Sequence, residues 1–205
     1  MKKIIPGLFL LIMLINYSAK ADSPLTSTDF YTAYIEIDIV NEAHNSQKFP
    51  DKIGDYLSSP KNSIDKKVAI VNALGWNIDG KNDAELFRVY LGKKYGIQNK
   101  LKISMNDFTG DELLCLGYMM AMDDYFKPQD GIDIAEMALK KNPTSYTFNL
   151  ITSLMKAQTM MDKSWCDLFK LTDTVDKNSL LKRDMKKEAV KIIFDYMNLY
   201  KSSCK

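Results

Sequence analysis

Two adjacent carboxylates follow one of the most apolar stretches of this chain. The segment DELLCLGYMMAMDDYF, residues 111–126, is apolar on nearly every side of a helix and then reaches Asp123 and Asp124. Two carboxylates that converge in a fold can carry out acid–base chemistry. At a helix C-terminus each also meets the negative end of the helix dipole, at a cost of roughly 0.3–1 kcal/mol. We therefore expect compensation from Lys127 or from a lysine of a neighbouring helix.

Aromatic side chains accompany the two aspartates. Tyr125 and Phe126 follow them directly, and Trp76 and Asp79 lie in the loop of a preceding helix pair. Aromatic anchors ringed by charge are typical of surfaces that bind partner proteins. The alternative is a solvated hairpin tip with a structural role only. The candidate contact residues are Trp76, Asp79, Asp123, Asp124, Tyr125 and Phe126.

Other catalytic and metal-binding patterns are not found in the sequence. The single histidine, His44, lies in the polar context EAHNSQ, and no cysteine has a context that suggests pairing with it. Zinc-type spacings are missing. The Asp-Gly loop after residue 75 fails as a calcium loop, because placing Gly80 sixth puts Gly75 first and Leu86 twelfth. We expect no metal and no cofactor. Paired carboxylates remain the only catalytic alternative.

The three cysteines allow one disulfide at most within the chain. They are Cys115, Cys166 and Cys204, so at least one thiol is free or pairs between chains. Cys115 lies inside the apolar segment, where a free cysteine behaves as a small hydrophobic residue. If a bridge forms, we expect it between Cys166 and Cys204. It would tie the last helix to the preceding one.

The first 21 residues have the pattern of a signal peptide. Lys2 and Lys3 precede an apolar run from Ile4 to Ile15, and small residues lead to a cleavage point after Ala21. The run is about a dozen residues, shorter than a membrane-spanning helix requires. The sequence thus predicts export to the periplasm or secretion, with no stable membrane anchor after cleavage. Residues 22–205 are expected to form a single α-helical domain.

Charge limits the partners of the mature protein. The chain has 28 Lys and Arg residues and 26 Asp and Glu residues. Loss of the three lysines at positions 2, 3 and 20 leaves 25 bases against 26 acids. A nearly neutral chain lacks the basic character that nucleic acid or anionic membranes attract. We expect another protein as the partner, and no nucleic acid.

Helical periodicity predicts an all-α fold. Apolar residues recur at helical intervals, whereas no run of alternating strand residues is convincing. Ser27 or Thr28 is expected to begin the first helix, Gly75 to end the third, and Asn142-Pro143 to end the sixth. The expected helices are 28–43, 53–57, 65–74, 84–95, 109–124, 128–141, 144–161, 164–171 and 178–200.

An internal similarity suggests how the helices are arranged. Residues 65–94 and 111–141 each have a helix, a polar Asp-Gly loop and a second helix that ends in lysines. The displacement of roughly 46 positions lies within the range of HEAT and armadillo repeats. Two copies do not make an array. The pattern therefore favours a compact stack of antiparallel helical hairpins over a HEAT-like solenoid.

One short motif resembles a known family. The string Cys115-Leu116-Gly117-Tyr118, in a helix of a small exported protein, resembles a motif of periplasmic immunity proteins. These proteins protect bacteria from peptidoglycan amidases delivered by type VI secretion. The resemblance implies a compact helical inhibitor of a cell-wall-degrading enzyme, and it carries no inhibitory residue over to this chain.

The sequence thus favours an exported helical module that binds another protein. In its concrete form, the expected function is periplasmic immunity or inhibition, in which a loop edge covers the partner's site. The first alternative is an enzyme that acts on cell-wall or glycan material through paired carboxylates. A second alternative is a secreted virulence or envelope factor with a structural role.

Overall fold

Helices make up nearly all the regular structure of this chain. The computed structural model describes residues 23–77, 80–97 and 104–204, and within them it contains no β-strand, only an isolated bridge between Ser145 and Lys182. The all-α fold is confirmed. The expected signal peptide and Asp79 lie outside the described residues. The elements are η1 (Phe30–Tyr34), α1 (Asp38–Ser46), α2 (Asp51–Ser58), α3 (Ile64–Leu74), α4 (Asp83–Lys94), η3 (Met105–Asp107), α5 (Gly110–Asp123), α6 (Gln129–Lys141), α7 (Tyr146–Gln158), α8 (Trp165–Lys177), α9 (Lys187–Met197) and η4 (Asn198–Ser203).

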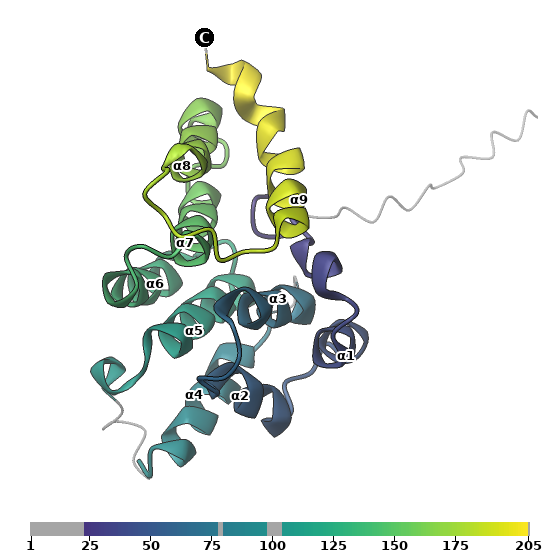
Figure 1. Ribbon diagram of the computed structural model, residues 1–205, viewed down its shortest axis with the longest axis vertical. Helices are drawn as coiled ribbons and strands as arrows, with labels where there is room; N and C mark the ends of the chain where they lie inside the picture. Colours follow the sequence, from purple (N-terminus) through teal and green to yellow (C-terminus); the bar gives the residue numbers. More distant parts are fainter. Residues whose placement is uncertain (1–22, 78–79, 98–103, 205) are drawn as a thin grey trace, which may run out of the picture.

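Helix α5 is the central element of the stack. It contacts α2, α3, α4, α6 and α7, and Figure 1 shows it in the middle of the molecule, between the early helices and α6 to α8. Almost all of its residues are buried, including Leu113, Cys115 and Tyr118. A helix that is surrounded on all sides needs apolar residues on all sides. This position explains the unusual composition of residues 111–122.

Among the described elements, α5 and α6 form the most extensive helix contact. A Cβ atom added to Gly117 of α5 would lie 2.5 Å from the backbone oxygen of Gly131 in α6, and one added to Gly131 would meet Gly117 in the same way. The two backbones therefore touch where they cross. Glycine at both positions allows this close approach, which fixes how the two helices cross.

The two segments that look alike in sequence pack differently. Residues 111–141 form the α5–α6 hairpin, as expected. In residues 65–94, however, α3 packs mainly against α1, α5 and η1, and α4 packs against α5 and α2. The similarity of sequence does not extend to equivalent packing of the two helix pairs.

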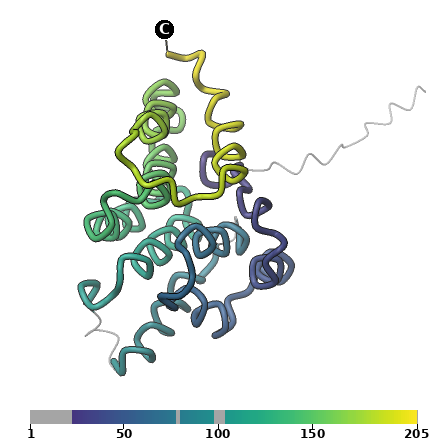
Figure 2. Tube along the Cα trace, in the orientation of Figure 1, coloured from purple at the N-terminus to yellow at the C-terminus, as the bar shows by residue number. Residues whose placement is uncertain are grey.

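The first helix is shorter than the sequence suggests. Instead of one helix over 28–43, a short 3-10 helix is followed by α1, which begins only at Asp38. Lys186, far along the chain, donates from Nζ to the carbonyl oxygen of Ala33 at 2.6 Å and to Glu36 at 2.9 Å. A continuous helix would use that carbonyl oxygen internally. Figure 2 shows this N-terminal segment beside the last helix.

The last helix is also shorter than expected. It does not begin near residue 178 but at Lys187, and residues 178–186 form a connector, while α8 continues to Lys177. The connector caps the start of α7: the backbone N–H of Tyr146 donates to the carbonyl oxygen of Lys182 at 3.0 Å, and that of Thr147 donates to Asp184 at 2.9 Å. These long-range bonds replace the helical bonds that the local sequence favoured.

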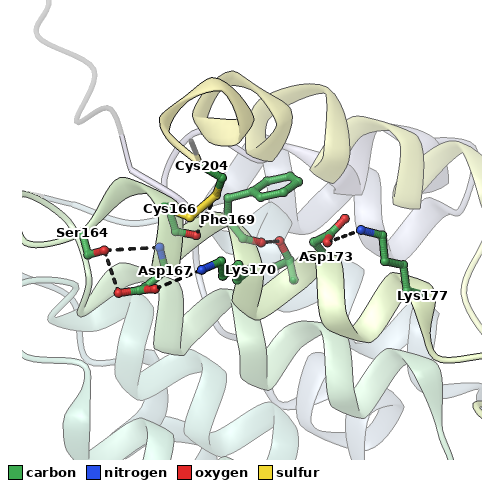
Figure 3. The surroundings of a disulfide bond; sticks show 9 residues. Ser164, Cys166, Asp167, Phe169, Lys170, Asp173, Lys177 and Cys204 are labelled. Atoms are coloured by element: carbon green, nitrogen blue, oxygen red, sulfur yellow. Dashed lines mark hydrogen bonds and ion pairs between the residues drawn. A yellow bond between two sulfur atoms is a disulfide. The ribbon is translucent and has the colours of Figure 1, made fainter.

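A disulfide fastens the C-terminal segment to α8. Cys166 and Cys204 are joined, with their Cα atoms 4.8 Å apart, and this is the pair that the sequence favoured (Figure 3). Beside the bridge, the rings of Trp165 and Tyr200 stack at 5.2 Å between centroids. Cys115 is a buried free thiol in α5, and burial raises its pKa.

Candidate functional site

The two adjacent aspartates have different roles. Asp123 turns toward α4, where its Oδ2 accepts a hydrogen bond from the backbone N–H of Ala84 at 2.9 Å. Asn82, at the N-cap position of α4, makes no side-chain cap bond. Asp123 therefore caps α4 from a different helix. The positive end of α4 thus compensates the carboxylate at the negative end of α5, and the charge of Lys81, just before α4, adds to this compensation.

Burial makes Asp123 unusual among the acids of this surface. Its pKa is raised to about 6, chiefly by burial, with a further contribution from the nearby Asp83; the bond from Ala84 and the charge of Lys81 act in the opposite direction. Its Oδ1 atom is buried without a hydrogen-bond partner in the described part of the chain. Lys81 is itself paired with Asp83, with 3.0 Å between Nζ and Oδ2.

Asp124 faces outward. Its side chain is exposed, and its Oδ1 accepts a hydrogen bond from the backbone N–H of Lys127 at 3.2 Å. This bond closes the turn between α5 and α6. No ion pair of Asp124 is found among the residues that the structure describes. The carboxylate is therefore available at the surface.

The aromatic candidates gather around the same turn. The ring of Trp76 meets Tyr125 edge-on, with 5.1 Å between centroids, and Tyr125 contacts Phe126 at 4.2 Å. Tyr125 is buried, whereas 72% of Phe126 is exposed. The structure thus brings Trp76, Asp123, Asp124, Tyr125 and Phe126 to one region. We call the segment from Asp124 to Gln129 the α5–α6 turn.

A pocket of about 540 Å³ opens on one side of the α5–α6 turn. Its wall comes from α4, α5, α6 and the short η3, and its apolar part is formed mainly by Met105, Leu116, Met120 and Ile134. Charged residues also line the pocket. The sequence gave no reason to single out several of them, such as Arg88 and Asp130, because they lie on separate helices. The charged and polar lining residues are Lys81, Asn82, Glu85, Arg88, Asp123, Asp124, Lys127 and Asp130.

The charges of the pocket are only partly paired. Arg88 binds Glu85, with 2.8 Å between Nε and Oε2, and Lys81 is held by Asp83. Asp124 and Asp130 have no ion pair with described residues, and neither has Lys127. Since Asp123 is also in the wall, the unpaired charge on this pocket is predominantly negative.

A second pocket, of about 460 Å³, lies on the other side of the turn. Phe126, Gln158 and Met161 are among its lining residues, and Lys127 lines both pockets. The α5–α6 turn is therefore a ridge between two hollows. Such a ridge can enter a concave partner surface while the hollows receive side chains from it.

The described ranges contain neither a candidate metal site nor a candidate membrane-spanning helix. Across 23–77, 80–97 and 104–204, no group of three or more His, Cys, Asp or Glu side chains is placed to hold a metal ion. In the same ranges, no helix combines the length and the apolar character needed to cross a membrane.

Comparison of the chain with protein-family models, with curated proteins and with solved structures finds no significant match.

Proposed function

We propose that this chain is an exported helical module that binds another protein through the α5–α6 turn. The observation that carries the proposal is the exposure of Phe126, 72% of which faces solvent at the tip of the turn. A large aromatic side chain gains much from burial, and aromatic anchors are common at the centre of protein interfaces. Exposed charged side chains, Asp124 and Lys127, lie beside this anchor in the turn, and a polar rim of this kind is common at interfaces.

The turn is held in place before any partner arrives. Tyr125 packs beneath Phe126 and against Trp76, and Asp124 fixes the backbone of the turn. The backbone contact of Gly117 with Gly131 sets the crossing of the two helices that the turn connects. A preorganised contact surface loses less conformational entropy on binding.

The concrete version of this proposal is a periplasmic immunity or inhibitor protein for a cell-wall-degrading enzyme. Its mechanism is steric: the ridge enters or covers the active-site cleft of the enzyme. The resemblance of residues 115–118 to immunity proteins motivates this version. Those four residues are buried in α5 and serve packing, and Leu116 among them also lines the candidate pocket.

An enzyme acting on cell-wall or glycan material is the second candidate. It is favoured by Asp123, a carboxyl group with a pKa raised to about 6 in the wall of a pocket. Perturbed pKa values of this kind mark many general acids and bases. However, Oδ2 of Asp123 is already used to cap α4, which gives the residue a structural role.

A pull-down from periplasmic and secreted fractions tests the binding proposal. The tagged protein should retain a stoichiometric partner that Phe126→Ala loses. Leu180→Ala is the matched control, because Leu180 is 87% exposed but lies in the connector before α9. If Phe126→Ala and Leu180→Ala retain the same partner equally, the α5–α6 turn is not the contact surface.

The enzyme candidate has its own test. The protein and Asp123→Asn are incubated with peptidoglycan and with soluble glycans, and products are followed by mass spectrometry. If the unsubstituted protein turns over a substrate and the folded variant does not, the chain is an enzyme. That result would contradict the binding proposal.

A further inference from the structure

We propose that the pocket between α4, α5 and α6 receives a lysine or arginine side chain of the partner protein. This inference rests on the proposed function, since it names the chemistry of the partner at the same surface. It comes from the combination of an apolar wall, unpaired carboxylates at the edge and an exposed aromatic anchor beside them.

The apolar wall suits the stem of a long basic side chain. The residues that form it are Met105, Leu116, Met120 and Ile134, and the volume of about 540 Å³ exceeds what one side chain fills. Lysine and arginine bury their methylene stems along apolar surface while the charged end stays in a polar setting. Methionine adapts its shape to such a guest.

The charges around the wall select a cation. The pocket's own Arg88 is paired with Glu85 and its Lys81 with Asp83. Neither therefore fills the position that an incoming cation would take. Asp124 and Asp130 are exposed and without an ion pair in the described chain. An ammonium or guanidinium group placed there would find acceptors that the fold itself leaves open.

Neither an anion nor a purely apolar group would be equally favoured. An anion would meet Asp123, Asp124 and Asp130, with Lys127 as the one lining base that has no ion pair among the described residues. An apolar group would cover carboxylates without giving them a hydrogen bond, which costs free energy.

The position of the pocket points to a protein as the source of the cation. Asp124 in the pocket wall and the exposed Phe126 are two residues apart on the α5–α6 turn. A partner surface that packs on Phe126 can thus reach the pocket with a neighbouring side chain. A free polyamine would make no use of the aromatic anchor.

Peptide titration followed by NMR tests the cation chemistry directly. The probes are acetyl-Gly-Arg-Gly-amide and acetyl-Gly-Lys-Gly-amide, with the norleucine peptide as an uncharged control. We expect amide shifts at Ala84, Asp124 and Gly131 with the basic peptides and much smaller shifts with norleucine. Equal shifts with norleucine, or shifts elsewhere on the molecule, would overturn the inference. Tighter binding of spermidine than of either basic peptide would also overturn it.

The variant for this test is Asp124→Asn/Asp130→Asn. The charge-matched control is Asp133→Asn/Asp162→Asn, because neither of those aspartates lines the pocket. Two ion pairs at about 0.7 kcal/mol each correspond to roughly tenfold weaker binding of the arginine peptide by the pocket variant. Unchanged binding in the pocket variant, or equal weakening in the control, would contradict the proposal.

The pull-down separates this inference from the proposed function. If Phe126→Ala loses the partner and Asp124→Asn/Asp130→Asn keeps it fully, the binding function stands and the lysine or arginine site is wrong. If the arginine peptide binds through the two aspartates while no partner is captured, the pocket chemistry is supported and the proposed function alone is weakened.

Discussion

Asp123 of α5 caps α4 across the tertiary structure, with 2.9 Å between its Oδ2 and the backbone nitrogen of Ala84. The carboxylate that looked misplaced at the end of an apolar helix thus lies at the start of another. The same bond joins two residues that line the candidate pocket. Asp123 therefore contributes a helix cap to the fold and also lines the candidate pocket.

Removal of the cap should destabilise the fold. We expect Asp123→Ala to lower the free energy of unfolding by about 1 kcal/mol, the usual loss for an N-cap side chain. Asp123→Asn should retain most of this stability, because an amide oxygen can accept the same bond from Ala84. Urea unfolding of both variants measures the difference. Equal losses in the two variants would mean that the hydrogen bond from Ala84 does not stabilise the fold.

Asp123 should also give the protein a distinct pH dependence. Its pKa rises from an ordinary 3.8 to about 6 in the folded state, mainly through burial. The folded state therefore binds the proton more tightly than the unfolded state. The resulting stabilisation is fully present below about pH 4 and is lost as the pH rises through 6.

The matched variant isolates this pH effect from that of other acids. Between pH 4 and 7, the free energy of unfolding of the unsubstituted protein should fall relative to that of Asp123→Asn. Urea unfolding at a series of pH values measures this difference. A difference that stays constant across the range would show that the pKa of Asp123 is not raised, and a difference that rises would show that it is lowered.

The glycine contact between α5 and α6 should tolerate no side chain. A Cβ at position 117 would lie 2.5 Å from the backbone oxygen of Gly131, so Gly117→Ala forces the two helices apart. We expect a loss of at least about 2 kcal/mol, the range of overpacked cores. Thermal and urea unfolding measure it.

Lys140→Ala, on the exposed part of α6, is the control for this prediction. It should change stability by less than about 0.5 kcal/mol. A Gly117→Ala variant as stable as this control would mean that the helices do not cross in backbone contact.

Reduction of the disulfide should loosen the C-terminal segment. Cys166 and Cys204 are separated by 38 positions, and their bridge reduces the conformational entropy of the unfolded chain. We expect Cys166→Ser/Cys204→Ser to be less stable by about 2–4 kcal/mol. Dithiothreitol should lower the melting temperature of the unsubstituted protein to about that of the variant. It should not change the melting temperature of the variant itself.

The remaining thiol offers an internal check on this prediction. Cys115 is fully buried, and burial raises its pKa, so it should react with a thiol reagent only after unfolding. Mass spectrometry of the native, oxidised protein should detect no labelled cysteine. Rapid labelling of Cys115 under native conditions would contradict its burial in α5.

The amino-acid sequence by itself determined the class of the fold and several local features. Helical periodicity and the near absence of strand patterns predict an all-α protein. Gly75 ends α3 with a φ of +72°, as a glycine at that position should. The apolar character of residues 111–122 also predicts burial. These features depend on neighbouring residues, which the sequence displays directly.

Only the tertiary structure decided the break before α1, the connector before α9 and the role of Asp123. In each case, a residue distant in sequence supplies the deciding contact: Lys186 for Ala33, Lys182 for Tyr146, and Asp123 for Ala84. The pocket likewise combines side chains of four helical elements, α4, η3, α5 and α6. Because local propensities differ by only a fraction of a kcal/mol per residue, such long-range bonds overrule them.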